Sequence, residues 1–170
     1  MLHKYICLGV CLINSTTSTA AEPTLLDDQF QLPPGFHIYR AAEPELTGGS
    51  YDLTFDGQGR LLVAEGNSLR RLVDTDNNGI YDSQETIAEG APLRGRGPQG
   101  LLVFDDNLYT VSGDGVQLLS GYNSRVKLKH ERRIGAPFNT GGDHAAHTIL
   151  RGLDGYIYLV SGDGGGISGR

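Results

Sequence analysis

Three stretches of the chain repeat one pattern, and this pattern decides the fold: LTFDGQGRLLVAEGNSLRRL at residues 53–72, LLVFDDNLYTVSGDGVQLL at 101–119 and ILRGLDGYIYLVSGDGGG at 149–166. Each contains two short runs of β-prone residues, the first ending at an Asp-containing turn and the second at a Gly-containing turn. Asp and Gly tolerate the positive φ angles of tight hairpin turns. Each stretch is therefore predicted to form a β-hairpin.

The spacing of the repeats indicates the architecture. When their second strands are aligned, Leu61, Leu108 and Ile157 fall in register, 47 and 49 residues apart. This period is typical of a four-stranded blade of a β-propeller. No stretch from residue 35 onward has the apolar periodicity of a helix. The sequence therefore predicts an all-β fold of the propeller type, with an ordinary antiparallel sandwich as the alternative.

The predicted organisation has three parts. Residues 1–20 combine a basic start, a short apolar run and the small residues Ser18-Thr19-Ala20, as in a secretory signal peptide, so we expect a periplasmic or extracellular protein. A lead-in over 21–34 precedes a propeller domain over 35–170. That domain has room for about two to three blades, whereas closed propellers have about 4 to 8. We therefore expect the N-terminal part of a longer protein, with lipid anchoring at Cys11 as a minor alternative.

Composition excludes several classes of protein. The chain has 14 Lys and Arg against 20 Asp and Glu, a net charge of −6, and no long basic block, so nucleic-acid binding as its main role is excluded. No apolar run reaches the roughly 20 residues of a membrane-spanning helix. Its two cysteines, Cys7 and Cys11, lie in the predicted signal peptide, so the mature protein has no disulfide. Without a Cys-x-x-Cys-His motif, this chain cannot attach haem covalently.

Residues 74–85 (DTDNNGIYDSQE) match the spacing of a twelve-residue calcium loop. Oxygen ligands are expected from Asp74, Asp76, Asn78, the carbonyl of Ile80, Asp82 and Glu85. The flanking residues resemble strand ends and not the helices of an EF-hand. The pattern predicts a calcium-binding or calcium-mimicking hairpin loop, and the alternative is a solvated turn that holds no ion.

A polar, Gly-rich segment at 136–148 (APFNTGGDHAAHT) holds the candidate catalytic residue, His144. A histidine directly before a strand would lie at the mouth of a propeller, and imidazole can take up a hydroxyl proton near neutral pH. Asp163 follows the next strand along the chain and would return to the same end of the sheet, where it could orient the imidazole. The alternative is a purely structural role for the histidines.

The run HAAHTILRGLDGYIYLVSGD at 144–163 resembles the segment of soluble quinoprotein glucose dehydrogenases and their sorbosone-dehydrogenase relatives that carries the catalytic histidine. Residues 34–90 are similar to the N-terminal blade of a secreted bacterial branch of this superfamily, whose members are often fused to cytochrome c-like domains. The second histidine, His147, fits that branch better than the quinone enzymes. The resemblance implies a six-bladed propeller of which this chain contains the first two to three blades.

By the same resemblance, His144 would be the general base and Asp163 its partner, with pyrroloquinoline quinone (PQQ) and Ca²⁺ as cofactors, a sugar or alcohol as substrate and a cytochrome c-like protein as electron acceptor. The chain departs from the family after Asp163, where glycines replace polar residues near the quinone, and the basic residues that hold the quinone belong to later blades. We therefore expect this portion to be inactive by itself. The alternative function is a non-catalytic, calcium-stabilised propeller that binds carbohydrate or a protein partner.

Overall fold

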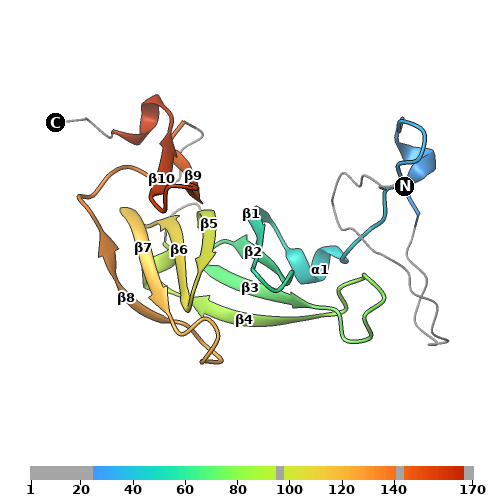
Figure 1. Cartoon of the computed structure of the whole chain (residues 1–170), viewed down its shortest axis with the longest axis horizontal. Helices are drawn as coiled ribbons and strands as arrows, with labels where there is room; N and C mark the ends of the chain where they lie inside the picture. Colours follow the sequence, from blue (N-terminus) through green and yellow to red (C-terminus); the bar gives the residue numbers. More distant parts are fainter. Residues whose placement is uncertain (1–24, 95–97, 141–143, 167–170) are drawn as a thin grey trace. The chain divides into compact units, whose positions relative to one another are not determined.

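A computed structural model describes residues 25–94, 98–140 and 144–166, and these are mainly β-strands (Figure 1). The all-β prediction is confirmed. The helical elements are short: η1 (Asp27–Gln29), α1 (Pro44–Thr47), η2 (Ala91–Leu93) and η3 (Asp163–Gly165). In the described part of the chain, no helix is long and apolar enough to cross a membrane. The predicted signal peptide, residues 1–20, lies outside the described residues.

The strands form two four-stranded sheets and a hairpin, each in simple chain order. The first sheet contains β1 (Ser50–Phe55), β2 (Leu61–Glu65), β3 (Ser68–Val73) and β4 (Ser83–Glu89). The second contains β5 (Gln99–Phe104), β6 (Asn107–Ser112), β7 (Gly115–Ser120) and β8 (Lys129–Ile134). The hairpin pairs β9 (Ala146–Arg151) with β10 (Ile157–Ser161). The three predicted hairpins are thus present, each as the first pair of strands of its repeat.

The described residues divide into two compact units, one of 25–47 and 72–84 and one of 48–71, 85–94, 98–140 and 144–166. In the first unit, single β-bridges join Leu25 to Tyr39 and Ala42 to Tyr81. Asp27 adds a hydrogen bond from the backbone N–H of Ile38, 2.8 Å long. The second unit contains the larger core and both residues of the predicted catalytic pair.

Each repeat has a β-bulge in its first hairpin, and the extra residues at the three bulges are Tyr51, Gly100 and His147. Counted from the bulges, Leu108 is equivalent to Leu62, so the predicted alignment of Leu108 with Leu61 was wrong by one residue. The turn between β5 and β6 has only two residues, whereas the β1–β2 turn has five. Because two leucines stand side by side in β2, the apolar pattern alone could not fix the register.

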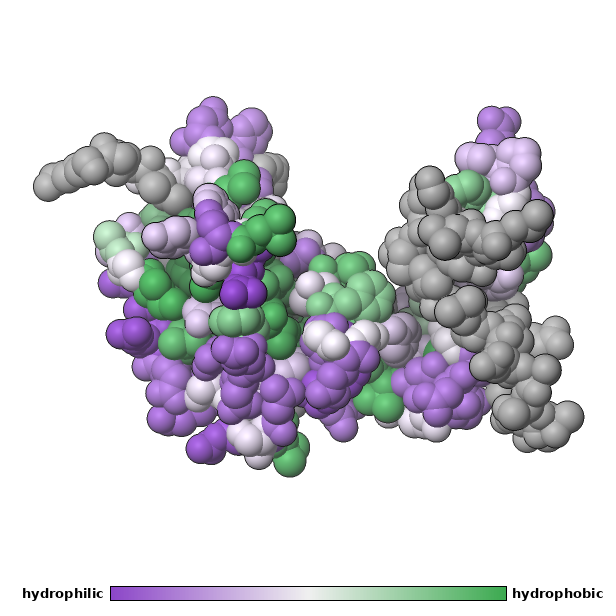
Figure 2. All heavy atoms as spheres, viewed as in Figure 1, coloured by the Kyte–Doolittle hydropathy of each residue, from purple (hydrophilic) through white to green (hydrophobic). Residues whose placement is uncertain are grey.

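The core of the second unit consists of two apolar clusters. One joins residues of the first and second sheets: Leu62, Ala64, Leu69, Ile87, Ala88, Leu93, Leu101, Leu108, Leu119 and Tyr122. The other joins the second sheet to the β9–β10 hairpin through Val111, Val116, Ala146 and Ile149. The hairpin also exposes apolar side chains, at Leu150, Leu153, Tyr156, Ile157, Tyr158 and Val160, and hydrophobic residues are visible on the surface of this unit (Figure 2).

The first strands of the second and third repeats, β5 and β9, approach closely at the Gly100 bulge (Figure 1). Gly100 has φ +84°, and a Cβ atom there would lie 2.6 Å from the carbonyl oxygen of His147. Its N–H donates to the carboxylate of Asp52 in the first sheet, at 2.8 Å. Burial raises the pKa of Asp52, and this effect outweighs the hydrogen bonds from backbone N–H groups, which lower it. The close contact between Gly100 and the backbone of His147 therefore sets the position of β9, and hence of His144, relative to the second sheet.

The chain directly before β8 does not form a strand, although charged and apolar residues alternate over 125–128. Strand β8 starts at Lys129, and Val126 is 89% exposed on a loop. The N–H of Arg125 donates to the carbonyl of Gly121 at 2.9 Å, so the chain is still turning at this point. The alternation of Val126 and Leu128 with charged residues therefore does not reflect a strand.

Candidate functional site

His144 and Asp163 form a hydrogen-bonded pair, with Nδ1 of the histidine 3.0 Å from Oδ1 of the aspartate. His144 lies two residues before β9, and Asp163 lies two residues after the end of β10. Because β9 and β10 are antiparallel neighbours, the start of one and the end of the other meet at the same edge. Both side chains are open to solvent, with 75% and 86% of their surfaces exposed.

The main chain holds this pair in place. The N–H of Gly164 donates to the carbonyl of His144 at 2.8 Å, and the N–H of Gly162 donates to the carbonyl of Ala145 at 3.3 Å. A Cβ atom on Gly162 would lie 2.6 Å from the His144 carbonyl oxygen, and one on Gly164 would lie 3.0 Å from it. Glycine is required here because the turn lies directly on the histidine backbone.

Buried neighbours anchor the exposed histidine. Ala145 and Ala146, which follow it, are both 0% exposed. Upstream, Thr140 forms a parallel bridge with Ala146 and donates from Oγ1 to the carbonyl of Gly113 at 2.6 Å. Asn139 donates from Nδ2 to the carbonyl of Gly164 at 2.9 Å. The imidazole is therefore presented to solvent from a well-supported backbone, as a functional side chain needs to be.

The arrangement defines what the two side chains can do. An ionised carboxylate only accepts hydrogen bonds, so a hydrogen bond between His144 and an ionised Asp163 requires the proton on Nδ1 of the imidazole. In the neutral imidazole, Nε2 is then the acceptor. This is the orientation of a general base whose second nitrogen is fixed by a carboxylate.

The predicted calcium ligands lie in the β3–β4 connection and the strand that follows it. Asp74 accepts the backbone N–H groups of Asn78 (3.1 Å) and Gly79 (2.8 Å), and Asp82 accepts the hydroxyl of Thr75 at 2.6 Å. Asp76 likewise accepts the N–H of Asn78, at 3.3 Å. The carboxylates therefore cap the turn's own backbone.

The three other predicted ligand residues, Asn78, Ile80 and Glu85, also form interactions of their own. Ile80 donates its N–H to Oδ1 of Asn78 at 2.7 Å, and Glu85 lies in β4, where it pairs with Arg71 at 3.4 Å. Among the described residues, no three His, Cys, Asp or Glu side chains are grouped so that they could hold a metal ion. Calcium binding at this loop stays a prediction, because the geometry described here does not gather its ligands.

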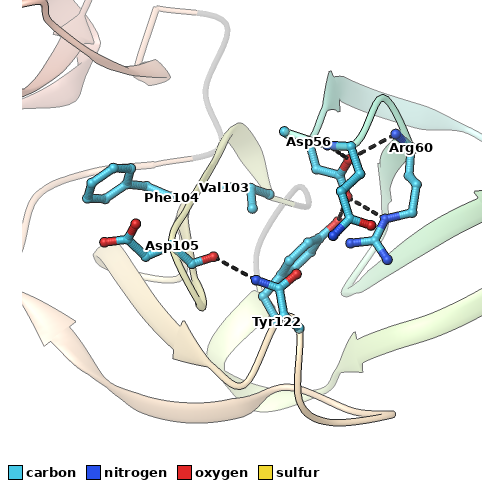
Figure 3. Close-up of a pocket in the computed structure, with 9 residues that line it drawn as sticks. Asp56, Arg60, Val103, Phe104, Asp105 and Tyr122 are labelled. Carbon is cyan, nitrogen blue, oxygen red and sulfur yellow. Dashed lines mark hydrogen bonds and ion pairs between the residues drawn. The ribbon is translucent and has the colours of Figure 1, made fainter.

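A second polar site, which sequence reasoning missed, lines a pocket in the second unit, the unit that also contains His144 (Figure 3). The carboxylate of Asp56 accepts the phenol of Tyr122 at 2.7 Å and Nε of Arg60 at 2.6 Å. The guanidinium groups of Arg60 and Arg71 lie over the Tyr122 ring, with their central carbons 5.3 and 5.0 Å from its centroid. The pocket is also lined by Val103, Phe104, Asp105 and other residues.

The titration of this second site indicates a structural role. Burial raises the pKa of Asp56, but hydrogen bonds from the backbone of Arg60, from Tyr122 and from the Arg60 guanidinium outweigh it, so the pKa lies below its usual range. Burial raises the pKa of Tyr122 to about 12, and its hydrogen bond to Asp56 acts in the same direction. An ionised acid beside a neutral phenol has no proton to exchange near neutral pH. The exposed His144–Asp163 pair is therefore the stronger candidate for catalysis.

Comparison with known proteins supports the fold. No protein-family model matches the chain, and no curated protein matches it. Among solved structures, it is similar to the iodide structure of a Trichoderma reesei carbohydrate-active enzyme of family AA12, with a TM-score of 0.53 and 21% sequence identity. The match covers 84% of this chain and 34% of the other, so the chain spans about a third of that structure's length. At this identity the similarity concerns the fold alone.

Replacing Gly162 with alanine should destabilise the turn at His144. The new Cβ would clash with the carbonyl oxygen of His144, at a cost of about 1–3 kcal/mol in the free energy of unfolding. Gly57→Ala is the matched control, because its Cβ would meet nothing within 4 Å and neither glycine has a positive φ. Urea unfolding of both variants measures the difference. Equal stability of the two variants would contradict the close approach.

Tyr122→Phe should lower the free energy of unfolding at pH 7 by about 1–3 kcal/mol, because the buried Asp56 carboxylate loses a donor. The folded state favours the neutral phenol of Tyr122, whose pKa is about 12, above an ordinary value of about 10. The wild type should therefore lose this contribution as the pH rises from about 10 to about 12, and the variant should lack that loss. Tyr156→Phe, at a side chain that is 72% exposed, is the control. Urea unfolding at each pH provides the comparison, and identical pH profiles for the two variants would count against the network.

Proposed function

We propose that this chain is the histidine-bearing part of a secreted, quinone-dependent sugar or alcohol dehydrogenase with a six-bladed propeller. The observation that carries the proposal is the solvent-exposed pair of His144 and Asp163, 3.0 Å apart at the edge of the β9–β10 hairpin. The two four-stranded sheets in chain order and the following hairpin support the propeller architecture. The name of the structural neighbour, a carbohydrate-active enzyme, favours a sugar as substrate.

The proposed role of His144 is to take up the proton of a substrate hydroxyl. When an alcohol or a sugar is oxidised to a carbonyl compound or lactone, the hydroxyl loses a proton and its carbon loses a hydride. Nε2 accepts the proton, since Nδ1 faces Asp163, and the carboxylate stabilises the imidazolium that results. Exposure of both side chains leaves room for a substrate to approach.

The described residues supply only this proton-transfer half of the site. PQQ, the quinone that the resemblance implies, would accept the hydride, and its carboxylates require cations. In the described ranges, no arginine or lysine pairs with His144 or Asp163. These residues therefore do not hold the quinone by themselves, and the proposal assigns its binding to parts of the protein outside the residues described here.

We propose that the whole protein works in the periplasm or outside the cell, that calcium binds at the 74–85 loop when Glu85 and the loop carboxylates are brought together, and that a cytochrome c-like protein receives the electrons. The chain spans 34% of the structural neighbour, so these properties belong to the complete protein.

His144→Gln in the full-length natural protein should lower dye-linked oxidation of sugars by about 10²–10⁴-fold, the usual contribution of a general base. Activity is measured after addition of PQQ and Ca²⁺ over a panel of aldoses and alcohols. His37→Gln is the matched control, because His37 is also paired with an aspartate, Asp27, at 2.6 Å, but lies in the other unit. Full activity of His144→Gln would overturn the assignment of the base. Reversible sugar binding without turnover by the wild type would favour the non-catalytic alternative.

A further inference from the structure

Asn139 links the segment before His144 to the turn that carries Asp163. Its Nδ2 donates to the carbonyl of Gly164 at 2.9 Å, and its backbone N–H donates to the carbonyl of Gly165 at 3.0 Å. Both acceptors belong to the 3₁₀ helix η3, whose first residue is Asp163. Asn139 therefore contacts two of the three residues of this helix.

The same helix also contacts the backbone of His144. The Gly164 peptide donates its N–H to the carbonyl of His144 at 2.8 Å. Gly164 thus receives a hydrogen bond from Asn139 at its carbonyl and gives one to His144 from its amide. The helix is held on both sides, with Asp163 immediately before the peptide that is held.

Asn139 is itself fixed by its neighbours in sequence. The N–H of Phe138 donates to the carbonyl of Asp114 at 2.9 Å, and Oγ1 of Thr140 donates to the carbonyl of Gly113 at 2.6 Å. Both acceptors lie in the turn between β6 and β7 of the second sheet. The second sheet therefore holds the backbone on both sides of Asn139. Asn139 in turn holds the turn of the third repeat that carries Asp163.

The turn needs such support because it has little of its own. Helix η3 has three residues and no side-chain hydrogen bond at its N-terminal cap. The side chain of Asp163 is 86% exposed, so packing does not restrict its direction. A short, exposed helix of this kind holds one rotamer of its first residue only if its backbone is fixed from outside.

We infer that Asn139 is a positioning residue that keeps the Asp163 carboxylate on Nδ1 of His144, and that it thereby fixes the imidazole in the Nδ1–H form with Nε2 free to accept a proton. This inference rests on the proposed function, since it assigns how the base is prepared. Asn139 does not touch the reacting hydroxyl. Its effect is on the tautomer of His144.

The tautomer can be read directly from the ¹⁵N chemical shifts of the imidazole nitrogens. The full-length natural protein is labelled with ¹⁵N-histidine, and the His144 signals are assigned by their loss in His144→Gln. In the wild type, we expect the neutral form of His144 to carry its proton at Nδ1. In Asp163→Ala, which has no acceptor for Nδ1–H, and in Asn139→Ala, we expect averaged shifts from a mixture of both tautomers.

Asn123→Ala is the matched control. The Nδ2 group of Asn123 also donates to a loop carbonyl, that of Asp105, at 3.0 Å, but the residue lies at the β7–β8 connection. This variant should leave the His144 tautomer unchanged. If Asn139→Ala does not fold, Asn139→Asp serves in its place, because it keeps the size of the side chain but has no Nδ2–H to donate.

The outcomes separate the two claims. A changed tautomer in both Asp163→Ala and the Asn139 variant, with Asn123→Ala like the wild type, supports the inference. If Asp163→Ala alters the tautomer but the Asn139 variant keeps a single Nδ1–H form, the positioning role is overturned and the proposed catalytic pair stands. If Asp163→Ala also leaves the shifts unchanged, the pair itself does not exist in solution and both proposals fail.

Discussion

The candidate site depends on one main-chain contact, the approach of the turn after β10 to the carbonyl oxygen of His144. Side chains are excluded at Gly162 and Gly164, where a Cβ would lie 2.6 and 3.0 Å from that oxygen. Because the turn lies on the backbone of the histidine, its first polar side chain, Asp163, is brought to Nδ1. Backbone hydrogen bonds between the same residues then hold the two parts together.

The repeat shows how one sequence pattern is used in two ways. The pentapeptide VSGDG occurs at 111–115 and again at 160–164. In the second repeat it forms the β6–β7 turn, and Asp114 is neutralised by an ion pair with Arg133 from β8. In the third repeat the chain enters a 3₁₀ helix, and Asp163 pairs with His144. The same pentapeptide thus places its aspartate beside an arginine in one repeat and beside a histidine in the other.

The sequence predicts the features that follow from periodicity and fails at those that depend on distant partners. Alternation and turn residues locate the hairpins, and the antiparallel arrangement of two successive strands brings His144 and Asp163 to one edge. The contact of Tyr122 with Asp56 spans 66 residues and leaves no periodic signal. Asn139 likewise stands in a Gly-rich segment, where an amide is usually read as part of a solvated loop. Its role is visible only once the turn at Gly164 is placed beside it.

Oxidation of a sugar or an alcohol by the protein is tested most directly with a substrate deuterated at the carbon that bears the reacting hydroxyl. The measurement is the rate of dye reduction by the full-length natural protein supplied with PQQ and Ca²⁺, for the deuterated and the ordinary aldose. We predict a slower reaction with the deuterated sugar, because the C–H bond is broken in the oxidation. Binding of both sugars with no reduction of the dye by either would contradict the claim.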